Sequence, residues 1–166
     1  EIKMNKLLTI ITLLCFSVAV NAQQPNWVSL TDTFIEAFDE DNPEVSKQIY
    51  LYQRCAAQQL SLATLLEEAN TNLAETYDRT AASLAQAAAI TRIMLATERT
   101  QSQQDTEAIS TSVLETITLL LEQYKAWLNH SYLLNGSYFE NNPDFQLEME
   151  ICQYAAQLAM TVADGL

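Results

Sequence analysis

Residues able to do metal, redox or acid–base chemistry are scarce in this sequence. His130 is the only histidine, which excludes a zinc site with two histidines and the paired Glu-x-x-His motifs of di-iron bundles. No Cys-x-x-Cys-His motif for covalent haem is present. Near the end of a predicted helix, His130 favours the negative end of the helix dipole. An alternative role for His130 is that of a general base beside Ser131 or Ser137, but the spacing of these residues in the sequence does not favour it. The sequence therefore predicts neither a metal nor a cofactor.

Paired carboxylates are the remaining candidates for catalysis, because glycosidases and aspartic enzymes need only two of them. Glu115 and Glu122 lie seven residues apart on the flank of an apolar stripe, and Glu67 and Glu68 lie at the end of another helical segment. All four fit solvated helix faces better than a buried pair. We therefore predict no catalytic residue, and a carboxylate-dependent hydrolase is the least favoured function class.

The charge of the chain excludes nucleic acid as a partner. The sequence has 21 Asp and Glu against 8 Lys and Arg, a formal net charge of -13, whereas phosphate binding needs a basic face. The arginines of the predicted helices could hold an anion, but they do not share one obvious face. We expect them to form surface ion pairs with nearby glutamates. They are Arg54, Arg79, Arg92 and Arg99.

Residues 1–22 are predicted to be a cleavable signal peptide, with Met4 as the start and residues 1–3 upstream of it. Lysines precede an apolar run over 7–20, and small residues follow it, so cleavage is expected before Gln23. As a helix the run is about 21 Å long, shorter than the hydrocarbon core of roughly 30 Å, which makes a transmembrane anchor the less favoured alternative. No stable membrane span is expected after cleavage, and the predicted location is periplasmic or secreted.

Cleavage would leave two cysteines, Cys55 and Cys152, in a chain exported to an oxidising compartment. An even number of cysteines in that setting predicts a disulfide between them, with two separate buried thiols as the alternative. Cleavage also removes one acid and two bases, so that 20 acids face 6 bases and the net charge becomes -14.

The scarcity of chain breakers predicts an all-α fold. From Glu44 to Asn135 there is no Gly or Pro, and one helix of that length would reach about 138 Å, so the chain must fold back. Polar clusters at 69–72 and 100–105 mark the expected turns, and Asn135-Gly136 marks a helix end. We predict an up-down four-helix bundle over 43–166.

Two Asn-Pro pairs are expected to begin helices, because Asn caps free N–H groups and Pro fits the first helical position. They are Asn42-Pro43 and Asn142-Pro143. Residues 23–42, which lead up to the first of these helices, are predicted to form an acidic arm with a short amphipathic helix. The expected apolar side of that helix consists of Leu30, Phe34, Ile35 and Phe38.

The arm is also where the acids concentrate. The stretch from Val45 to Leu133 holds nine acids and six bases, so most of the imbalance lies outside the bundle body. Helix-terminal charge and solubility explain this pattern, and a docking surface for a basic partner is the alternative. The candidate partner-binding residues are Asp32, Glu36, Asp39, Glu40 and Asp41, with the aromatic residues Trp27, Phe34 and Phe38.

A second group of aromatic residues lies around the predicted end of the third long helix and the start of the next one. They pack over one end of the bundle or form an exposed rim for a peptide, glycan or hydrophobic ligand. They are Tyr132, Tyr138, Phe139 and Phe145.

These observations favour an exported, non-enzymatic binding protein of the cell envelope, of the inhibitor or immunity type, with a basic protein as partner. A carrier or sensor that holds a small apolar ligand between its helices is the main alternative. A helical bundle by itself implies no function, and the sequence does not indicate an oligomeric state.

Overall fold

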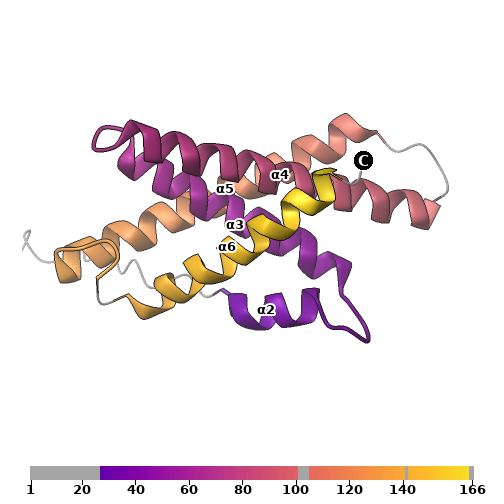
Figure 1. Ribbon diagram of the computed structural model, residues 1–166, viewed down its shortest axis with the longest axis horizontal. Helices are drawn as coiled ribbons and strands as arrows, with labels where there is room; N and C mark the ends of the chain where they lie inside the picture. Colours follow the sequence, from indigo (N-terminus) through magenta and orange to yellow (C-terminus); the bar gives the residue numbers. More distant parts are fainter. Residues whose placement is uncertain (1–26, 101–104, 141, 165–166) are drawn as a thin grey trace, which may run out of the picture.

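The computed structural model describes residues 27–100, 105–140 and 142–164; the predicted signal peptide and its cleavage site lie outside these described residues. The described residues form five helices and no strand, which confirms the all-α prediction (Figure 1). The helices are α2 (Leu30–Ala37), α3 (Val45–Leu66), α4 (Thr71–Thr100), α5 (Thr106–Asn135) and α6 (Pro143–Asp164).

The helices end where the sequence places polar breaks. The Asn70 side chain accepts a hydrogen bond from the Leu73 N–H in the first turn of α4. Asp105 caps α5 by accepting from the Ala108 N–H at 3.1 Å. Gly136 ends α5 with φ at 71°, a left-handed conformation that glycine adopts without a Cβ penalty. The predicted turn near 69–72 and the predicted stop at Gly136 are therefore confirmed.

The two Asn-Pro pairs behave differently. Asn142 accepts from the Phe145 N–H and α6 begins at Pro143, as predicted. The prediction for Asn42-Pro43 is wrong, because α3 begins only at Val45. The Asp39 carboxylate there accepts from the N–H groups of Asp41 and Asn42, at 3.0 and 2.8 Å. This local turn holds Asn42 in the loop, so it cannot cap the helix.

Helix α2 is amphipathic, but its buried side differs from the prediction. Leu30, Thr33 and Ala37 are buried, whereas Ile35 is 59% exposed, so its assignment to the apolar side is wrong. Thr33 is tolerated inside because its hydroxyl donates to the Ser29 carbonyl at 2.9 Å.

Helix α3 is the centre of the bundle and packs against α2, α4, α5 and α6. Every residue from 51 to 59 is buried, over more than two turns and on all sides of the helix. Four helices surround this segment, so its burial is not confined to one side. Among the described residues, α5 and α6 make no close backbone contact, so the packing of the bundle is uneven.

A disulfide joins the centre of the bundle to its last helix. Cys55 of α3 and Cys152 of α6 are bonded, with their Cα atoms 5.2 Å apart and both residues fully buried. The predicted pairing is therefore present, and it closes a loop with a sequence separation of 97.

Within the described residues, no helix combines the length and apolar character needed to cross a membrane.

Candidate functional site

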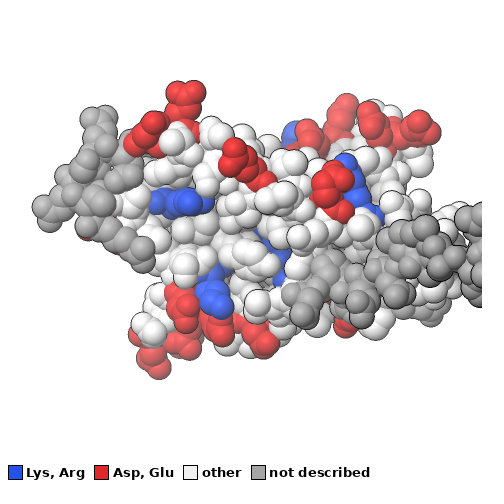
Figure 2. Space-filling view, turned by 180° about the vertical axis from the view of Figure 1, so that it is seen from behind, with Lys and Arg blue, Asp and Glu red and all other residues white. Residues whose placement is uncertain are grey.

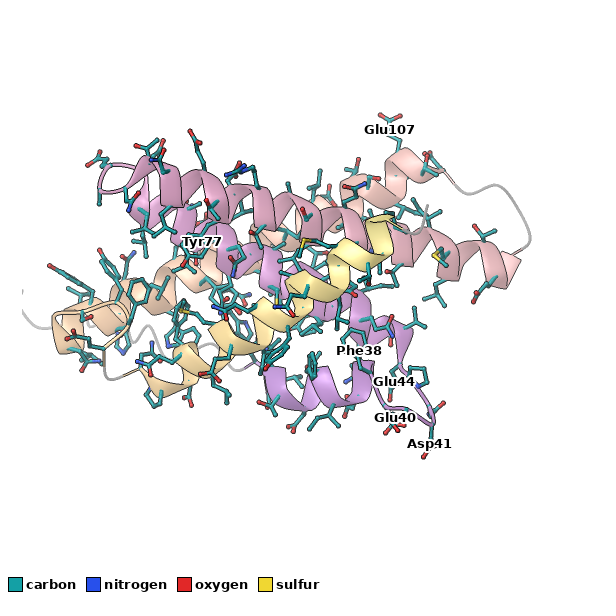
Figure 3. All side chains as sticks on the ribbon, viewed as in Figure 1. Phe38, Glu40, Asp41, Glu44, Tyr77 and Glu107 are labelled. Atoms are coloured by element: carbon teal, nitrogen blue, oxygen red, sulfur yellow. A yellow bond between two sulfur atoms is a disulfide. The ribbon has the colours of Figure 1, made fainter. Side chains whose placement is uncertain are left out.

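The candidate acidic residues lie on α2 and on the loop that leads from it to α3. Together with Glu44, which ends the same loop, these five candidates form what we call the acidic surface: Asp32, Glu36, Asp39, Glu40, Asp41 and Glu44. All are exposed except Glu36, which is half-buried and pairs with Lys47 at 2.7 Å. Glu40, Asp41 and Glu44 lie at the outer edge of this loop, away from the bundle (Figure 3). From behind, acidic side chains gather over this part of the molecule (Figure 2).

The three candidate aromatic residues are partly buried against the core instead of standing free beside the acids. The Phe34 and Phe38 rings contact each other with centroids 5.2 Å apart. Trp27 lies further along, against α5, with its ring 4.5 Å from Tyr124 and 5.6 Å from Trp127. The structure therefore brings the acids together on one surface and separates Trp27 from them.

Trp27 helps to fill the space between α5 and α6, whose backbones do not meet. Its indole N–H donates to the side-chain oxygen of Gln123, and the guanidinium of Arg54 lies 4.4 Å from its ring centre. Phe145 of α6 closes the other side, with its ring 5.5 Å from Trp127. The arm is thus part of the core and not a separate appendage.

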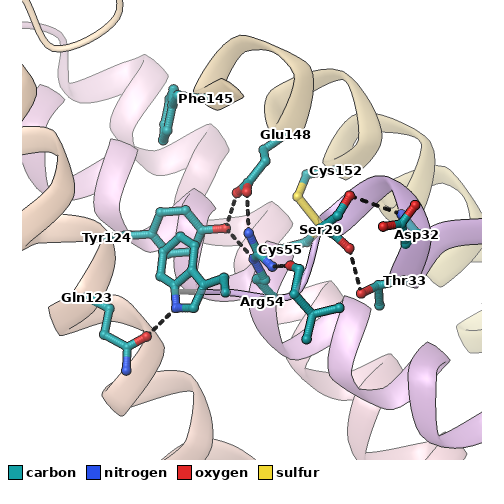
Figure 4. A network of polar contacts seen from close by, with 12 residues as sticks. Ser29, Asp32, Thr33, Arg54, Cys55, Gln123, Tyr124, Phe145, Glu148 and Cys152 are labelled. Carbon is teal, nitrogen blue, oxygen red and sulfur yellow. Dashed lines mark hydrogen bonds and ion pairs between the residues drawn. A yellow bond between two sulfur atoms is a disulfide. The ribbon is translucent and has the colours of Figure 1, made fainter. Parts of the chain in front are cut away.

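Arg54 is the centre of a buried polar network between three helices (Figure 4). The residue is only 1% exposed, so the predicted surface ion pair is wrong for Arg54. Its guanidinium donates to Glu148 of α6, to the Tyr124 hydroxyl of α5 at 3.2 Å, and to the Val28 carbonyl of the arm. The Tyr124 hydroxyl in turn donates to the second Glu148 oxygen at 2.6 Å. One arginine therefore links the arm, α5 and α6 to α3.

This network was not predicted from the sequence, although Glu148 lies four residues before Cys152. On a helix that spacing places both residues on one face, so a disulfide between Cys55 and Cys152 brings Glu148 toward Arg54. Arg54 directly precedes Cys55, and Glu148 lies one turn before Cys152, so opposite charges close to the two predicted disulfide partners were the available signal.

Burial controls the protonation of this network. Desolvation raises the pKa of the Tyr124 hydroxyl well above its usual value, so the hydroxyl stays protonated and donates. Desolvation also raises the pKa of the Glu148 carboxyl, while Arg54 and the Tyr124 hydroxyl oppose that rise. Both Glu148 oxygens are already hydrogen-bonded, which suits a structural role better than general acid–base catalysis.

A cavity of about 220 Å³ lies beside the network. Its lining is mixed: two carboxylates and a guanidinium stand beside apolar side chains and the start of α2. A small apolar ligand would leave these charged groups without water, so the cavity gives no support to the apolar-carrier function. The lining residues are Trp27, Val28, Ser29, Leu30, Thr31, Arg54, Asp144, Leu147 and Glu148.

Helix α3 also buries three glutamines, which were not predicted as core residues. Gln53, Gln58 and Gln59 are each no more than 5% exposed. Gln59 donates to the Gln58 side-chain oxygen, but the side-chain nitrogens of Gln53 and Gln58 have no hydrogen-bond partner. Such groups weaken a core because their desolvation is not compensated.

His130 is half-buried and lies five residues before the end of α5, so it is outside the last turn, where the predicted interaction with the helix dipole would be strongest. The described residues contain no group of three or more His, Cys, Asp or Glu side chains arranged to hold a metal ion.

Comparisons with protein-family models, curated proteins and solved structures find no match, so the proposals below rest on the geometry and chemistry of this chain.

Proposed function

We propose that this protein is an exported, non-enzymatic binding protein of the cell envelope, of the inhibitor or immunity type. Its acidic surface receives a basic protein partner. The proposal includes a cleaved signal peptide at residues 1–22 and four long helices in up-down order. The observation that carries it is the segregation of exposed acids on α2 and the following loop.

Two features of the acidic surface support binding and not only solubility. The loop is ordered by the Asp39 carboxylate and by a hydrogen bond from the Glu44 N–H to the Glu36 carbonyl at 3.0 Å. The acidic side chains of the loop are therefore already ordered before a partner binds, which lowers the entropic cost of binding. Lys47 is the only base between Trp27 and Gln53, and it already pairs with Glu36, so the surface keeps an excess of negative charge. Complementary charge favours fast and specific association with a basic face.

The proposal predicts that a charge reversal in the acidic loop abolishes partner capture. Immobilised chain from Gln23 onward is expected to retain a basic protein from an envelope extract, and added salt is expected to weaken the retention. The Glu40→Lys/Asp41→Lys variant should lose that protein, because both exposed side chains lie at the outer edge of the loop. Quantitative mass spectrometry of the eluted proteins measures the loss.

The matched control is Glu75→Lys/Asp78→Lys, which changes the net charge equally at two exposed positions of α4. This control should retain the partner. Equal loss in both variants would mean that only net charge matters, and absence of any basic protein in the wild-type eluate would contradict the proposal.

A further inference from the structure

A hollow with a largely apolar lining lies close to the acidic surface. It has a volume of about 370 Å³ and lies between the first turn of α3, the last third of α4 and the last turn of α6. These helix ends lie toward the right of Figure 1. The apolar residues of the lining form what we call the apolar groove: Val45, Ile90, Met94, Leu95 and Val162.

The fold forms this groove without help from a partner. Helices α3, α4 and α6 pack against one another, and the groove residues are half-buried except Met94, which is 55% exposed. Gln48, which also lines the hollow, donates a hydrogen bond from its side-chain amide to the Ala37 carbonyl at 2.7 Å. This bond holds the end of α2 beside the groove. Because the groove is already shaped, binding would not have to order it first.

The apolar groove is continuous with the acidic surface. Val45 directly follows Glu44, the last residue of that surface. Glu98 is exposed and is the only charged residue among those that line the hollow. A partner that covers the groove would therefore meet carboxylates next to an apolar depression.

Such a combination supplies what an acidic surface alone lacks. Complementary charge mainly increases the rate and specificity of association and adds less to affinity. Stable interfaces also have an apolar centre, where a few side chains of the partner lose their water, and a polar rim around it. The apolar groove can be that centre, and the neighbouring carboxylates can be part of the rim.

We propose that the apolar groove receives one large apolar side chain of the basic partner. Lysine or arginine residues on either side of this anchor contact Glu44 and Glu98. This inference rests on the proposed function, because it specifies the segment of the basic partner that binds. The charges select this occupant over a second copy of the chain, which has a net charge of -13 and would bring like charges together.

Titration with two synthetic peptides tests the proposal on the chain from Gln23 onward, which contains every described residue. Both peptides carry lysines on each side of a central residue, which is phenylalanine in one and alanine in the other. Fluorescence anisotropy should show about tenfold tighter binding of the phenylalanine peptide, because only its ring fills the groove. With isotope-labelled methionine methyl groups, that peptide should shift the NMR signal of Met94 and leave that of Met160 in place.

Met94→Glu separates the anchor from general charge attraction. The substitution adds a negative charge, which by itself would strengthen the binding of a lysine-rich peptide, but it also places a carboxylate in the apolar lining. We expect about tenfold weaker binding of the phenylalanine peptide. The matched control is Met160→Glu, which adds the same charge at a methionine of α6 that is 53% exposed and does not line the hollow. The control should bind at least as tightly as the wild type, and both variants should keep the wild-type thermal midpoint.

The proposal is overturned if neither peptide binds, if both bind equally, or if Met94→Glu binds as tightly as the control. It is also overturned if light scattering shows a dimer that Met94→Glu dissociates. Equal binding of both peptides that Glu40→Lys/Asp41→Lys abolishes would reject the groove and keep the acidic surface as a binding site. A preference for phenylalanine that survives this charge reversal would support the groove and contradict the proposed function.

Discussion

Replacing both cysteines, Cys55→Ala with Cys152→Ala, is expected to lower the free energy of unfolding by about 4 to 5 kcal/mol. The disulfide closes a loop with a sequence separation of 97, and loss of so long a cross-link gives the unfolded chain much more conformational freedom. Both residues are fully buried, so alanine is preferable to serine, which would bury a hydroxyl. Equilibrium unfolding in urea, followed by circular dichroism, measures the change.

Reduction provides the control for this experiment. The wild type in reductant should unfold at about the denaturant concentration of the double variant, and the double variant should not respond to reductant. A double variant within about 1 kcal/mol of the oxidised wild type would show that packing of α6 on α3 does not need the bond.

Removing the buried cation, Arg54→Met, is expected to lower the free energy of unfolding by about 3 to 5 kcal/mol at neutral pH. The variant leaves the Glu148 carboxylate buried without its charge partner, and it frees the Val28 carbonyl and the Tyr124 hydroxyl from their donor. The double variant Arg54→Met/Glu148→Leu should recover most of this loss, because a packed apolar pair can replace a buried ion pair at little cost. Urea unfolding of the three proteins completes the comparison.

The loss in Arg54→Met should depend on pH in a defined direction. Burial already raises the pKa of Glu148, and without Arg54 that pKa rises further. A group whose pKa is higher in the folded state stabilises the fold below its unfolded pKa, and this contribution disappears as the pH rises through the folded value. The deficit of Arg54→Met should therefore shrink below the usual range of a glutamate and widen above it. A deficit that grows on acidification would contradict the assignment of Glu148 as the charge left unpaired.

The arrangement of the helices along the chain could be predicted because it depends on local chemistry. Chain breakers are nearly absent, Asp105 caps α5 and Gly136 ends it, so the pattern of the sequence is enough to place these boundaries. The difference between the two Asn-Pro pairs was not predictable from the pairs themselves. It arises from the Asp39 side chain, which competes for the N–H groups that would otherwise lead into a helix.

The surroundings of α3 could not be predicted, because apolar spacing tells how a helix is oriented but not how many helices cover it. Arg54 and Gln58 are typical surface residues by type, yet they are buried because four helices surround this segment. The same reason explains the position of Trp27, which contributes to a core formed by helices distant in sequence. Of the candidate partner-binding residues, the acids lie together on one exposed surface, and their role in binding stays a prediction.

We propose that this protein is exported and that its disulfide between Cys55 and Cys152 forms outside the cytoplasm. Intact-mass measurement of the protein recovered after expression from the full sequence tests this claim most directly. We predict a chain that begins at Gln23 and that gains no mass from a thiol-alkylating reagent unless it is first reduced. A product that retains residues 4–22, or one with two cysteines open to alkylation under native oxidising conditions, would contradict it.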